Sequence, residues 1–85
     1  MNINYEILTP DKIYMKGDRI CISIEALDLA ENIAHYSPDE QKLLYQDTCY
    51  MAHKEKAAHF IPEIKLFFEY VKRMHKQIEK MEVER

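Results

Sequence analysis

The apolar residues in the last third of the chain repeat at alternating intervals of three and four positions. We call this set the C-terminal seam, and it consists of Ile64, Phe67, Val71, Met74, Ile78 and Met81. Such spacing is typical of a helix that packs along its length against another helix. It predicts a helix over residues 62–82. We expect the rest of the domain to cover only part of the seam, and a second copy of the chain to cover the remainder.

A different pattern near the start of the chain predicts a β-ribbon over about residues 3–24. In its second arm Ile20, Ile22 and Ile24 alternate with more polar residues, which indicates a strand with one buried face. Gly17 is the only glycine and lies between the two arms, where the chain must reverse. We expect Gly17 to have a positive φ, because glycine adopts such angles without steric cost.

Two further helices are expected between the ribbon and the seam. The first covers about residues 24–36 and has Ser23 as a plausible N-cap. The second covers about residues 38–60, and its start is marked by Ser37, with Glu40 three positions later completing a capping box.

Pro62 interrupts the pattern after the second helix. Proline lacks a backbone donor and restricts the residue before it, so the chain could either break there or continue as one kinked helix. Both alternatives remain open from the sequence. Together these elements predict a predominantly helical α+β fold, with an N-terminal β-hairpin and two or three helices, in one small domain of residues 1–85.

Charge and composition narrow the classes of function. The chain has 85 residues, of which 47% are hydrophobic, and a net charge of −3. Residues 1–62 have six basic and ten acidic side chains, whereas residues 63–85 have six and five. Neither part has the strongly positive field used in nonspecific nucleic-acid binding, so we do not expect a nucleic-acid partner.

The cysteines and the hydropathy pattern bear on location. Cys21 and Cys49 are far apart in sequence, which favours free thiols in a reducing compartment. The first residues lack the basic start and apolar run of a signal peptide, and no apolar stretch is long enough to span a bilayer. We therefore expect a cytoplasmic protein with no membrane association.

Few residues are arranged as catalytic or metal sites usually are. Cys49 and His53 are one helical turn apart, but no second close pair of ligands accompanies them, as a zinc site would require. A single glycine cannot build a phosphate-binding loop. We therefore expect no enzymatic activity, no metal and no cofactor.

Tyrosines and lysines provide candidate contact residues. Six tyrosines are many for this length, and tyrosine is enriched in protein interfaces. We expect Tyr45 and Tyr70 to be the exposed ones. Lys72 and Lys76 begin a basic row on the last helix, which could face an acidic partner or only solvent. These four residues are the candidate partner-facing positions.

The leading functional hypothesis is a non-catalytic protein-interaction module, such as a small dimeric regulator, inhibitor or assembly adaptor. Its partner protein is not identified by the sequence. The C-terminal seam would form the dimer or partner interface.

The alternative is a dimeric DNA-binding regulator. From Arg19 onward, one alternating strand followed by two helices resembles the ribbon-helix-helix family. The resemblance implies that paired strands enter the major groove and that Arg19, Cys21 and Ser23 face the bases. It covers about half of the chain, and the acidic balance and the Ser37-Pro38 turn depart from the family pattern.

Overall fold

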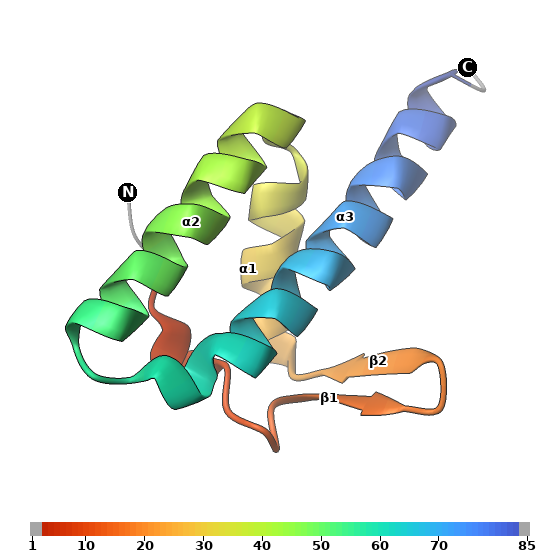
Figure 1. The fold of residues 1–85 in the computed structure, drawn as a ribbon. Coiled ribbons are helices and arrows are strands. Elements are labelled where there is room, and N and C mark those ends of the chain that lie inside the picture. The colour runs from red at the N-terminus through yellow and green to blue at the C-terminus, as the bar shows by residue number, and fades with distance from the viewer. Residues whose placement is uncertain (1–2, 84–85) are drawn as a thin grey trace.

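A β-hairpin and three α-helices make up most of the computed structural model, which describes residues 3–83 (Figure 1). In chain order the elements are η1 (Tyr5–Ile7), β1 (Ile13–Lys16), β2 (Arg19–Ile22), α1 (Ile24–Ala34), α2 (Pro38–Lys54), η2 (Ala58–Phe60) and α3 (Ile61–Val83), where η denotes a 3-10 helix. The expected class, a predominantly helical α+β fold, is confirmed.

The hairpin is shorter than the ribbon expected over residues 3–24. β1 and β2 pair in antiparallel register from Ile13–Ile22 to Lys16–Arg19, and Gly17 between them has the expected positive φ of 65°.

The segment before the hairpin forms one turn of 3-10 helix instead of a strand. The Asn4 side chain accepts a hydrogen bond from the Glu6 N–H at 3.1 Å, which caps this turn. A turn of three residues brings Tyr5 and Leu8 to the same side, and both are buried. A strand would have pointed them to opposite faces, so burial of both side chains favours the turn.

The two helix starts are as the sequence predicted. Ser23 accepts a hydrogen bond from the Ala26 N–H at the start of α1. At the start of α2, the Ser37 hydroxyl accepts from the Glu40 N–H at 3.2 Å, and the Glu40 carboxylate accepts from the Ser37 N–H at 3.3 Å. This reciprocal pair is the predicted capping box.

The expected second helix over residues 38–60 is too long, because α2 ends at Lys54. The Ala57 N–H donates to the Ala52 carbonyl at 2.7 Å, and the Lys56 N–H donates to the His53 carbonyl at 3.1 Å. These are the two hydrogen bonds of a Schellman motif, and Lys56 has the positive φ of 58° that the motif requires. A lysine thus holds the position where glycine is usual, so composition gave no sign of the reversal.

Pro62 lies in the first turn of α3, which begins at Ile61. The chain therefore breaks between the second and third helices and does not form one kinked helix. The first turn has no intrahelical acceptor for its N–H groups, so the missing proline donor has no effect there.

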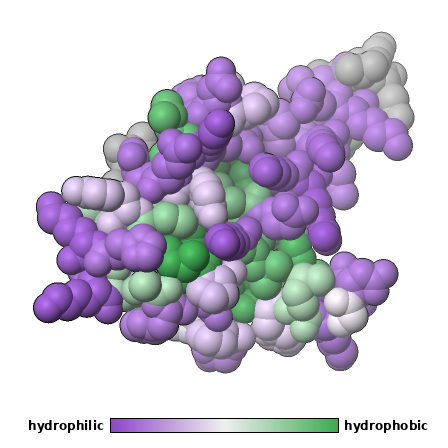
Figure 2. All heavy atoms as spheres, viewed as in Figure 1, coloured by the Kyte–Doolittle hydropathy of each residue, from purple (hydrophilic) through white to green (hydrophobic). Residues whose placement is uncertain are grey.

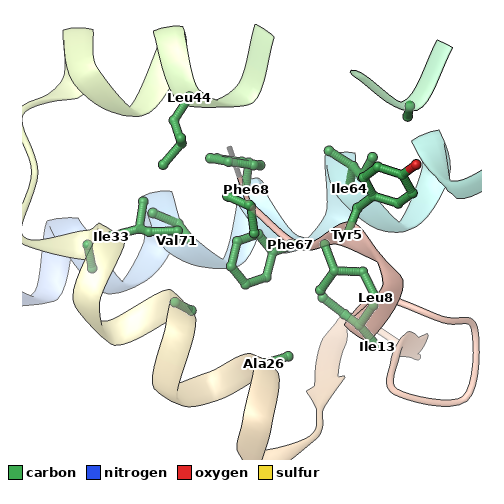
Figure 3. Close-up of a cluster of buried hydrophobic side chains, with 14 residues drawn as sticks. Tyr5, Leu8, Ile13, Ala26, Ile33, Leu44, Ile64, Phe67, Phe68 and Val71 are labelled. Carbon is green, nitrogen blue, oxygen red and sulfur yellow. The ribbon is translucent and has the colours of Figure 1, made fainter. Parts of the chain in front are cut away.

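The core is centred on α3. Ile64, Phe67 and Val71 are fully buried and point toward α1 and the N-terminal segment (Figure 3). On α1, Ala26, Ala30 and Ala34 are spaced four residues apart and are also fully buried; Leu8 and Ile13 cover the end of the core nearest the hairpin. Small side chains on α1 allow α3 to approach closely, and these two helices make the most extensive helix–helix contact in the structure.

The N-terminal segment is tied to the α2–α3 reversal. The Tyr5 hydroxyl donates a hydrogen bond of 2.6 Å to the Glu55 carboxylate, and the Tyr5 ring packs at 5.2 Å from the Phe60 ring. The hydrogen bond to Glu55, with a smaller effect of burial, raises the pKa of Tyr5 to about 12. The bond thus joins residues fifty positions apart.

Replacing Lys56 with glycine should stabilise the fold. A non-glycine residue in the left-handed region costs about 1–2 kcal/mol, part of which glycine loses again through the greater freedom of the unfolded chain. We expect Lys56→Gly to raise the free energy of unfolding by about 0.5–1 kcal/mol in urea denaturation. Lys54→Gly, at the last residue of α2, is the control and should lower it, because Lys54 has helical angles that glycine does not favour. A lower stability for Lys56→Gly would show that the Schellman geometry is wrong.

The Tyr5–Glu55 hydrogen bond should make stability fall at high pH. The pKa of Tyr5 is raised in the folded state, so this contribution is fully present below pH 10, the ordinary tyrosine pKa, and is lost as the pH rises toward 12. Wild type should therefore be more stable than Tyr5→Phe at pH 8, and the difference should shrink between pH 10 and 12. Urea denaturation across this range measures it. A difference that does not change with pH would contradict the assignment.

Candidate functional site

A groove lies between α2 and α3, the two helices whose arrangement Figure 1 shows. We call it the α2–α3 groove, and its volume is about 810 Å³. In Figure 2 hydrophobic surface is visible between the hydrophilic side chains of the two helices. The groove is lined by Pro38, Asp39, Gln41, Lys42, Tyr45 and Gln46 of α2 and by Lys65, Phe68, Glu69, Lys72, His75, Lys76 and Glu79 of α3.

Two aromatic side chains form the apolar part of the groove. Tyr45 and Phe68 pack edge to face with ring centroids 5.3 Å apart, and Phe68 makes a similar contact with Phe67 in the core. Burial, and secondly the neighbouring Cys49, raises the pKa of Tyr45 above its ordinary value. The Tyr45 hydroxyl thus lies beside the Cys49 thiol, at the edge of the core.

One end of the groove is held by His75. Its Nδ1 atom lies 2.7 Å from the Ala34 carbonyl oxygen at the end of α1, and its Nε2 atom lies 2.9 Å from a Glu79 carboxylate oxygen. The Ala34 carbonyl oxygen can only accept, so Nδ1 is the donor in this contact. His75 thereby connects α3 to the C-terminal end of α1.

Gln41 strengthens this connection from α2. Its amide nitrogen donates to the Tyr36 carbonyl at 2.8 Å and lies 3.3 Å from His75 Nδ1. Gln41 is buried although it is polar. The side chains of Gln41 and His75 therefore fix the position of α3 relative to the α1–α2 connection.

The rim of the groove has more unpaired positive than negative charge. One of its carboxylates has a cationic partner, because Glu69 lies 3.8 Å from Arg73, and the Glu79 carboxylate lies against the His75 ring. No carboxylate among residues 3–83 lies within ion-pair distance of the four rim lysines, Lys42, Lys65, Lys72 and Lys76. These exposed lysines leave the rim with an excess of cationic groups.

The groove brings together three of the predicted partner-facing residues, Tyr45, Lys72 and Lys76. Tyr70 is not among its lining residues and packs against the core. The expectation that Tyr45 and Tyr70 are the exposed tyrosines is wrong, because both are half-buried, whereas Tyr14 and Tyr50 are 46% and 66% exposed.

The sequence did not single out Phe68, His75 or Gln41 as site residues. On α3, the groove positions repeat every three or four residues beside the seam, at Lys65, Phe68, Lys72, His75 and Glu79. The spacing of this second stripe is the feature from which the groove could have been predicted. A hydropathy pattern does not show it, because the stripe contains both apolar and charged side chains.

The first half of the C-terminal seam is not available to a second copy. Ile64, Phe67 and Val71 have no exposed surface, because the alanines of α1 allow α3 to pack closely inside the chain. Their assignment to a dimer or partner interface is therefore corrected: they are core residues. Farther along the seam, Met74 and Ile78 are half-buried and Met81 is 69% exposed, so any interface on the seam would use these three residues.

The hairpin differs from the ribbon that the ribbon-helix-helix resemblance implies. β2 pairs with β1 of the same chain, and the Ser23 hydroxyl accepts a hydrogen bond from the start of α1. Arg19 is exposed, but Cys21 and Ser23 are half-buried. The three residues therefore do not form one exposed base-reading face in this chain.

The structure places the remaining candidate residues as follows. Cys21 and Cys49 are free thiols. Within residues 3–83, no three His, Cys, Asp or Glu side chains are grouped so that they could hold a metal ion, and Cys49 with His53 gains no third ligand. None of the helices in this range has the length and apolar character needed to cross a membrane.

No protein-family model matches the chain, and neither the curated proteins nor the solved structures contain a match.

The exposed end of the seam predicts the oligomeric state. We expect a dimer at micromolar concentration in sedimentation velocity, held by Met74, Ile78 and Met81. Met81→Glu should shift it to monomer with little change in melting temperature, because Met81 is 69% exposed. Leu43→Glu is the matched control on α2, where Leu43 is 60% exposed, and should leave the dimer intact. Monomer alone across the micromolar range would refute this prediction.

Proposed function

We propose that this protein is a non-catalytic interaction module that binds another protein in the α2–α3 groove, as a small regulator, inhibitor or assembly adaptor does. The observation that carries the proposal is the combination of a partly apolar groove with a charged rim on one face of the molecule. Protein interfaces have this organisation, with a desolvated centre and a polar margin.

The aromatic pair supports this function. Tyr45 lines the groove and is held rigid by its edge-to-face packing on the nearly buried Phe68 ring, so its remaining exposed surface is available to a partner. Aromatic side chains of this kind carry much of the binding energy in protein interfaces, because they bury a large area with little loss of conformational freedom.

The polar groups of the groove are arranged to hold structure and do not suggest catalysis. Both ring nitrogens of His75 have partners, and one of these is the backbone of α1. The lining residues include no serine, threonine or cysteine that could act as a nucleophile beside His75. This supports a binding role.

The same proposal includes weak self-association and a cytoplasmic location. The partly exposed Met74, Ile78 and Met81 provide a surface for a second copy, beyond the groove. The two free thiols fit a reducing compartment.

Site-specific photocrosslinking in the native host tests the proposal. A photoreactive amino acid at Gln46, which is exposed at the groove, should give a defined crosslinked protein. The same amino acid at Glu31, exposed on α1 and outside the lining residues, is the control and should not. If the product at Gln46 is no stronger than that at Glu31, the groove is not the binding site.

A further inference from the structure

We infer that the segment bound in the α2–α3 groove is an amphipathic α-helix whose apolar stripe is flanked by carboxylates. This inference rests on the proposed function and names the chemistry of the partner. Three features of the groove carry it: its helical walls, its dimensions and the charge of its rim.

The walls of the groove favour a helix over an extended peptide. An extended segment needs backbone donors and acceptors from its binding site, as at the edge of a sheet. Here both walls are helices, whose interior N–H and C=O groups are bonded within the helix. A helical ligand satisfies its own backbone and needs only side-chain contacts.

The dimensions also fit a helix. The lining residues of α3 run from Lys65 to Glu79, which corresponds to about 21 Å at 1.5 Å per residue. This length matches about four turns of a bound helix. Such a helix would lie along α3, with the α2 wall from Pro38 to Gln46 beside about 12 Å of it, and would place its apolar stripe against Tyr45.

The rim specifies the charge of the ligand. Lys65, Lys72 and Lys76 line the α3 side and Lys42 lies on the α2 side. Of the carboxylates, Glu69 is already paired with Arg73, and Glu79 is directed at the His75 ring. Asp39 remains, in the first turn of α2, where a negative charge is favoured by the helix dipole. A ligand with carboxylates on both sides of its apolar stripe would therefore meet lysines on both rims.

The same features argue against single-stranded nucleic acid as the occupant. Proteins that bind single-stranded nucleic acid stack the bases on exposed aromatic side chains. Phe68 is only 6% exposed and Tyr45 is half-buried with its ring against Phe68. The lysines could contact phosphates, but the groove provides no exposed stacking platform.

Two synthetic peptides of eighteen residues test the inference on the full-length protein. Both have leucines at helical spacing; one has glutamates beside the leucine stripe, and the other has lysines at the same positions. In fluorescence anisotropy the glutamate peptide should bind at least tenfold more tightly than the lysine peptide. Equal binding, or tighter binding of the lysine peptide, would overturn the inference.

Charge reversal locates the binding site. Lys72→Glu with Lys76→Glu should weaken binding of the glutamate peptide at least tenfold and reduce its salt dependence. Lys12→Glu with Lys16→Glu makes the same change in net charge at exposed positions near and in the hairpin, and should change the affinity less than twofold. All four lysines are exposed, so melting temperatures should be similar. Equal losses for both pairs would mean that the attraction does not come from the groove.

Two further measurements identify other possible occupants, a nucleic acid and a second copy of the chain. Tighter binding of a single-stranded oligonucleotide than of the glutamate peptide would overturn the inference in favour of nucleic acid. Dissociation of the dimer by the Lys72→Glu and Lys76→Glu pair would mean that a second copy occupies the groove. If Gln46 captures a protein whose crosslinked segment is basic or not helical, the proposed function stands and this inference falls.

Discussion

The close packing of α3 against α1 determines where everything else in this chain can lie. Ala26, Ala30 and Ala34 form a stripe of small, fully buried side chains on α1, and α3 presents Phe67 and Val71 to the same core. Because methyl groups replace larger side chains along one helix, the other helix can approach closely and bury its bulkier residues. The pair makes the most extensive helix–helix contact in the structure. The hairpin and α2 are then positioned by their contacts with α3.

This arrangement gives α3 two roles on two adjacent stripes. One stripe, the first half of the C-terminal seam, faces α1 and is fully buried. The next stripe, from Lys65 to Glu79, lines the α2–α3 groove. Phe68 joins the two, because its ring contacts Phe67 in the core and Tyr45 at the groove. A change in core packing at Phe67 would therefore be transmitted directly to the groove surface.

The parts of the fold that could be predicted depend on local chemistry. Ser37 and Glu40 form their capping box within four residues, and Gly17 adopts its positive φ at a hairpin turn, so the residue types alone were sufficient. The reversal at Lys56 could not be predicted in this way, because its left-handed conformation is held by hydrogen bonds to Ala52 and His53 and not by glycine.

The candidate site shows the same limit. Lys72, Lys76 and Tyr45 could be nominated from residue type, since exposed basic and aromatic residues often make contacts. Phe68 and His75 acquire their roles only when α2 and α1 are placed beside α3. The heptad spacing likewise identified a packing face, but spacing cannot distinguish a helix of the same chain from a helix of another copy. The structure shows that Ile64, Phe67 and Val71 pack within the chain, in the core that contains the alanines of α1.

The separation in sequence between the partners of the core has a consequence for folding kinetics. Tyr5, Leu8 and Ile13 are buried in one cluster with residues of α3, and the Tyr5–Glu55 hydrogen bond joins residues fifty positions apart. The entropy of closing such a long loop must be overcome before these contacts can form. We therefore expect the hairpin and α1 to gain stable structure only when α3 docks, so that the domain folds in one cooperative step.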